Sequence, residues 1–126
     1  MPYAVSKNKF AELVEAALAE LPAEFAKFLE EVPVEIRDRP TRDELAGLHI
    51  GPGSLLLGLY RGRPRTRRTV EDTGTLPDVI YIFQDNIQAV CRSEDELIRQ
   101  VRKTVLHEIG HHFGLSEQDL DRLGYG

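Results

Sequence analysis

The sequence predicts an α+β protein in which helical patterns come first, strand patterns follow, and a long helical pattern comes last. Two amphipathic stretches with three- and four-residue apolar spacing enclose a run of β-branched and aromatic residues at 79–83. The 126 residues suffice for one ordinary domain and are too few for two. We therefore expect a single domain over residues 1–126.

The first third of the chain is expected to form two helices, a strand and a helical turn. Apolar periodicity predicts an amphipathic helix over 6–21, and Pro22 suits the first turn of a second helix that ends before Pro33. The alternation over 34–37 predicts a half-buried strand, and a short helical turn is expected within 41–47.

The middle of the chain carries strand signals on both sides of an arginine-rich segment. The apolar run 55–60 predicts a well-buried strand, and the five arginines within 61–68 predict a solvated loop or hairpin tip. The strongest strand signal is 79–83, expected to be central or near-central. We also consider this strand as a backbone edge for an extended peptide substrate.

The last long element is a helix predicted over about 93–113. Ser93, followed by Glu96, forms a capping-box pattern at its start, and Gly114 is placed to end it. Ser116 can begin one further short helical turn.

Charge and composition restrict the partners and the compartment. The net charge of −5 argues against a polyanion as main partner, and no aromatic residue interleaves the arginines of 61–68 to stack bases. Cys91, the only cysteine, excludes an intrachain disulfide and is expected to be a small buried hydrophobe. Without a signal-peptide pattern or an apolar run that spans a bilayer, we expect a cytoplasmic protein and no membrane partner.

The predicted long helix carries the residues that indicate a metal-binding and catalytic site. His107, Glu108 and His111 form the pattern H-E-x-x-H, and residues four apart on a helix lie about one turn and 6 Å apart on one side. Both imidazoles can therefore bind one zinc ion, and Glu108 can act as general base on water for peptide hydrolysis. Two plainer interpretations are a helix that happens to carry two histidines and a metal bound only for stability.

A catalytic zinc site needs a third protein ligand besides the two histidines. Gly114 allows the chain to turn back sharply after the helix, and Glu117 follows three residues later. We predict Glu117 as the third ligand, with Asp119 and then Asp121 as the alternatives.

The run HEIGHHFGLSEQDL resembles the signature of the small bacterial zincin-like metallopeptidases, often called minimal zincins. The family pattern is H-E-x-x-H-x-x-G-x-x-D, so Glu117 stands where the family has an aspartate. The resemblance implies a zincin-like core, a small mixed β-sheet packed with helices. It also implies His107 and His111 as zinc ligands and Glu108 as the base.

These observations predict a zinc metallopeptidase that acts on a peptide or protein substrate. Because the chain is small, a partner protein could complete a shallow cleft. One alternative is a non-catalytic, metal-stabilised protein-interaction module that uses the arginine-rich segment. Another is a regulatory protease that cleaves one repressor or antitoxin.

Overall fold

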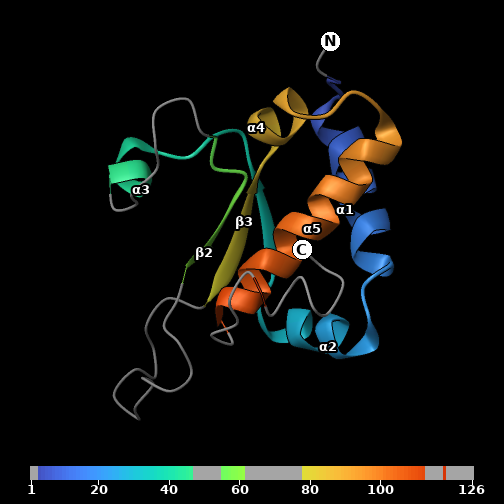
Figure 1. The fold of residues 1–126 in the computed structure, drawn as a ribbon, viewed down its shortest axis with the longest axis vertical. Coiled ribbons are helices and arrows are strands. Elements are labelled where there is room, and N and C mark those ends of the chain that lie inside the picture. The colour runs from blue at the N-terminus through green and yellow to red at the C-terminus, as the bar shows by residue number, and fades with distance from the viewer. Residues whose placement is uncertain (1–2, 47–54, 62–77, 113–117, 119–126) are drawn as a thin grey trace.

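The fold is an α+β arrangement of helices around a small mixed sheet, as the sequence predicts (Figure 1). The computed structural model describes residues 3–46, 55–61, 78–112 and 118. In chain order the elements are α1 (Lys7–Ala19), α2 (Ala23–Glu31), β1 (Val34–Arg37), α3 (Arg42–Ala46), β2 (Gly58–Arg61), β3 (Val79–Phe83), α4 (Gln84–Ala89) and α5 (Glu94–His112).

The sheet has the strand order β1-β3-β2, with β1 parallel and β2 antiparallel to the central β3. The prediction that 79–83 forms a central strand is confirmed. Because β3 is paired along both sides, its backbone is not available to an extended peptide, and that part of the prediction is wrong. Among the residues that the structure describes, the outer strands of the sheet are β1 and β2.

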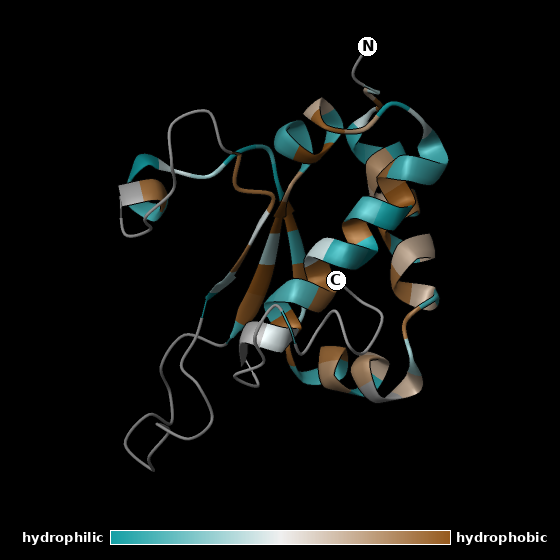
Figure 2. Ribbon diagram, viewed as in Figure 1, coloured by the Kyte–Doolittle hydropathy of each residue, from teal (hydrophilic) through white to brown (hydrophobic). Residues whose placement is uncertain are grey.

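The main core lies between one face of the sheet and the helices α1 and α5. Ile80 and Ile82 of β3 are fully buried there, and Figure 2 shows β3 as a hydrophobic strip within the sheet. Residues from both helices complete this core: Phe10, Leu13, Val14 and Ala17 of α1, and Leu97, Val101, Val105 and Ile109 of α5. The three- and four-residue spacing of these side chains explains why both segments are helical.

The opposite face of β3 carries Tyr81 between two arginines. The Arg37 guanidinium lies 4.1 Å and the Arg61 guanidinium 5.2 Å from the centre of the Tyr81 ring. Cations at this distance from an aromatic face are attracted by the ring quadrupole. Tyr81 is only 2% exposed, so this face of the sheet is also covered at its centre.

Two elements differ from the predictions. The strand expected over 55–60 is β2, which begins only at Gly58, ends at Arg61 and lies at the edge of the sheet, while Leu55 is 48% exposed. Arg61 was expected in the loop and instead pairs with Val79 in the ladder. The short helix α4 was not predicted, because its six residues contain three amide side chains and only two aliphatic ones.

Candidate active site

The helix α5 brings the H-E-x-x-H motif against the sheet. Its start is fixed as predicted, because the Ser93 hydroxyl accepts a hydrogen bond from the Glu96 amide at 3.2 Å. Leu97, Val101 and Ile109 along α5 are fully buried. Their packing sets the rotation of α5 about its axis and leaves His107 and Glu108 only half-buried.

Both predicted histidine ligands lie in the last turns of α5. The backbones of His107 and His111 are four residues apart in continuous helix, the spacing that lets two imidazoles share one ion. The structure describes the side chain of His107 and only the backbone of His111. The two residues therefore fit a common metal ion by backbone position, and their coordination stays a prediction.

Glu108, the predicted base, contacts the edge strand β2. Its Oε1 atom accepts a hydrogen bond of 2.8 Å from the backbone N–H of Tyr60. Bonds from an N–H group to a carboxylate are stronger than bonds between neutral groups, so this contact restrains where the carboxylate lies. Sequence reasoning missed Tyr60, because a contact made by a backbone amide leaves no signature in the side chain.

Tyr60 is itself held at a second point. Its phenol O–H donates to the Asp78 carboxylate at 2.7 Å, and Asp78 directly precedes β3. The ring packs against the main core. The amide that holds Glu108 is thus part of a residue fixed both to the core and to the start of the central strand.

The candidates for the third ligand follow α5 in the sequence. Glu117 and Asp119 both lie outside the described residues, as does the segment 62–77 that contains most of the arginine-rich run 61–68. Within the described ranges, no three His, Cys, Asp or Glu side chains gather as a metal-binding group. The assignment of Glu117 stays a prediction.

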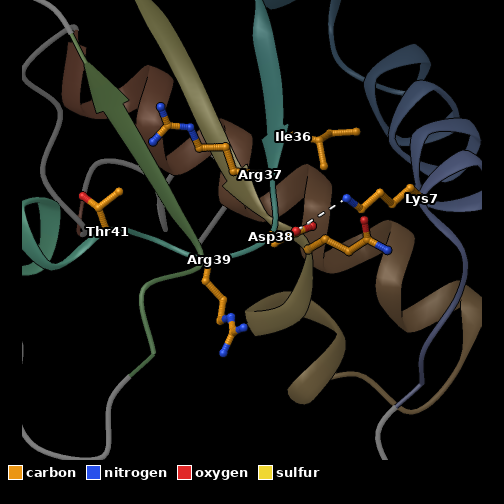
Figure 3. Close-up of a pocket in the computed structure, with 7 residues that line it drawn as sticks. Lys7, Ile36, Arg37, Asp38, Arg39 and Thr41 are labelled. Atoms are coloured by element: carbon orange, nitrogen blue, oxygen red, sulfur yellow. Dashed lines mark ion pairs between the residues drawn. The ribbon is translucent and has the colours of Figure 1, made fainter.

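An open cavity of about 520 Å³ lies at the other end of the central strand (Figure 3). Gln84, which follows β3, and residues at and after the end of β1 line it, whereas Glu108 contacts Tyr60 opposite Ile80 near the start of β3. The cations on its wall each pair with a carboxylate: Lys7 with Asp38, Arg37 with Glu44 and Arg39 with Asp85. These pairs offset the positive charge of the cavity and give no sign of a site for an anion.

Two further sequence predictions concern burial and membranes. Cys91 is 1% exposed, which confirms the prediction of a small buried hydrophobe. In the part of the chain that the structure describes, no helix has the length and apolar character needed to cross a membrane.

Comparison with known proteins identifies the family. The family model described as zincin-like metallopeptidase matches residues 29–126, from α2 to the end of the chain. The chain belongs to the zincin-like metallopeptidase family. The family match includes every residue predicted for the site.

A solved structure has a similar fold. A conserved hypothetical protein from Thermo thermophilus matches with a TM-score of 0.55 and 26% sequence identity, over 94% of this chain and 97% of that one. No curated protein matches. The 94% of this chain covered by the structural match is a larger share than residues 29–126, so the structural similarity extends into the part of the chain before residue 29.

Proposed function

We propose that this zincin-like protein is a zinc-dependent peptidase in which Glu108 is the general base. The observation that carries the proposal is the position of Glu108. It lies beside His107 in a helix that also holds His111, and its carboxylate is held by the Tyr60 amide. A general base must be presented in a fixed position within reach of the proton that it takes, and this contact supplies a restraint of that kind.

His107 and His111 would hold the zinc ion, together with Glu117 or Asp119. When bound, zinc supplies a Lewis acid that polarises the scissile carbonyl and makes a nearby water more acidic. Glu108 takes a proton from the attacking water and delivers it to the nitrogen of the leaving amine. Imidazole and carboxylate groups are established zinc ligands, so the available donors suit the ion.

The base is tested by Glu108→Gln in the full-length protein. The amide keeps the size and shape of the side chain and cannot accept the proton. The assay follows cleavage of a quenched fluorescent peptide library by zinc-loaded protein, with zinc content measured on the same samples. We expect the variant to retain zinc and to lose about 10²- to 10⁴-fold in kcat, the range for general bases.

The same experiment separates the peptidase from a metal-stabilised interaction module. Such a module would bind zinc, and neither the wild-type protein nor Glu108→Gln would cleave any member of the library. Equal cleavage by the two proteins would instead show a contaminating protease or a different base. Both results contradict the proposal.

A further inference from the structure

We infer that Gly58 is a positioning residue for Glu108. The inference rests on the proposed peptidase function and adds to it a residue outside the motif. Gly58 is the first residue of β2 and lies two positions before Tyr60, whose amide holds the carboxylate. It acts by having no side chain at the point where the edge strand meets α5.

The contact at Gly58 leaves no room for a Cβ atom. A Cβ built there would lie 2.5 Å from Thr104 Cγ2, 3.1 Å from the Tyr81 carbonyl oxygen and 3.6 Å from Glu108 Cγ. The first distance is far inside van der Waals contact, so the Thr104 side chain, α5 or β2 would have to shift. A shift of α5 or β2 acts directly on Glu108, because Thr104 lies one helical turn before it on the same side of α5.

The register of β2 explains why its amides reach α5. Leu57 accepts a hydrogen bond from the Phe83 amide, and Gly58 lies opposite Ile82. In an antiparallel ladder, alternate residues bond to the neighbouring strand, so Leu59 and Arg61 bond to β3. The amides of Gly58 and Tyr60 then point toward the outer edge of the sheet, where the Glu108 carboxylate accepts the hydrogen bond from the Tyr60 N–H.

The position of the carboxylate therefore depends on the spacing between β2 and α5. The hydrogen bond is 2.8 Å long, and lengthening it by a few tenths of an ångström weakens it. Displacements of about 1 Å at a catalytic group can cost about 10²-fold in rate. Gly58 sets this spacing at the start of β2, and the Tyr60–Asp78 bond holds the later part of β2 to the start of β3.

Thr104 allows a matched rescue. The closest obstacle to a side chain at position 58 is the Thr104 methyl group, which Thr104→Ser removes. Serine retains the hydroxyl that accepts a hydrogen bond from Gln100 Nε2 at 3.1 Å. The double variant Gly58→Ala/Thr104→Ser should thus restore much of the original spacing, while the contact with the Tyr81 carbonyl oxygen limits the rescue.

Leu59→Ala is the control for destabilisation alone. Leu59 belongs to the same strand but packs with Val79, Tyr81 and Phe83 on the face of the sheet away from α5. Its truncation destabilises β2 without adding an atom next to Glu108. We expect this variant to have a lower melting temperature and an unchanged kcat per folded, zinc-loaded molecule.

The test measures kcat, KM, zinc content and melting temperature for the full-length protein and these four variants. We expect Gly58→Ala to lose at least about tenfold in kcat with KM within twofold of wild type and zinc content unchanged. The added Thr104→Ser should recover most of this loss, and Thr104→Ser alone should have little effect. An unchanged kcat in Gly58→Ala, or a loss that Thr104→Ser does not reduce, overturns the inference.

Amide hydrogen exchange at Tyr60 tests the same contact without any assay of activity. The Tyr60 amide should exchange slowly in the wild type and in Glu108→Gln, whose amide oxygen still accepts the bond. It should exchange at least about tenfold faster in Glu108→Ala and in Gly58→Ala. Equal Tyr60 exchange in Glu108→Ala and wild type overturns the inference even if Gly58→Ala does not fold. If the Tyr60 amide exchanges slowly but the protein cleaves no peptide, the result contradicts the proposed peptidase function and leaves the contact between Tyr60 and Glu108 intact.

Discussion

Replacing Tyr60 by Phe should lower the stability of the edge strand by a measurable amount. The substitution removes only the phenol O–H group, which donates a 2.7 Å hydrogen bond to Asp78. Hydrogen bonds to charged groups contribute about 1.5–3 kcal/mol, and solvent screening reduces this where the partners are partly exposed, as these two are. We therefore expect a loss of about 1–2 kcal/mol in the free energy of unfolding.

The assay for this prediction is equilibrium urea unfolding, supported by thermal melts. For a chain of this size, 1–2 kcal/mol corresponds to a fall in melting temperature of roughly 4–10 °C. A double-mutant cycle with Asp78→Asn isolates the pair, since both single variants weaken the same bond. The expected coupling energy is about 0.5–1.5 kcal/mol. A coupling energy near zero, with an unchanged melting temperature in Tyr60→Phe, would refute the claim that this bond anchors β2.

Three further predictions concern Cys91, the start of α5 and metal removal. Burial, with a smaller contribution from Glu96, raises the pKa of the Cys91 thiol. In the unfolded chain the thiol ionises near pH 8.5, whereas in the folded protein it stays neutral to higher pH. The free energy of unfolding is therefore at its full value below about pH 8.5 and falls as the pH rises through the folded-state pKa, because ionisation of the thiol favours the unfolded chain. Urea unfolding of wild type and Cys91→Ala from pH 7 to 10 should show a steeper decline for the wild type, and parallel curves would contradict this. Ser93→Ala removes the acceptor for the Glu96 amide and should cost about 1 kcal/mol in urea unfolding, whereas Arg92→Ala should be close to neutral. Chelation of zinc should lower the melting temperature of wild type and leave the melting temperature of His107→Ala unchanged. The reason is that zinc at 100 times its dissociation constant stabilises the folded protein by about 2.7 kcal/mol. An equal shift in both proteins would contradict binding at His107.

The long helix and the central strand were predictable because local pattern and tertiary role agree in them. In α5 the capping serine, the apolar spacing and the buried face all indicate the same helix, and the structure confirms the predicted 93–113 to within a residue at each end. The strand 79–83 is buried at every position, as a continuous run of β-branched and aromatic residues indicates.

The start of the edge strand was mispredicted by three residues. Apolar character alone favoured a strand from Leu55, but β2 begins only at Gly58, where the absence of a side chain allows the close approach of α5. Nothing within the segment itself reports that contact. The helix α4 was missed because a polar six-residue segment gives too little periodicity to distinguish a helix from a turn.

For the candidate site, the functional side chains could be predicted from the sequence, whereas the contacts that position Glu108 could be found only in the structure. The motif singled out Glu108 because its spacing relative to two histidines has few other uses. Glu108 contacts a backbone amide 48 residues away in sequence and lies beside a glycine 50 residues away, and no spacing rule connects these positions. The choice between Glu117 and Asp119 still rests on the sequence pattern alone.

The central claim, a zinc ion bound by the motif helix, is tested most directly by the zinc content of native protein. Wild type, Glu108→Gln, His107→Ala and His111→Ala would be dialysed against metal-free buffer and measured by plasma mass spectrometry. We predict about one zinc per chain in wild type and Glu108→Gln, the stoichiometry of a mononuclear site, and loss of zinc in both histidine variants. Wild-type protein that takes up no zinc even when it is added back, or histidine variants that retain it fully, would contradict the account.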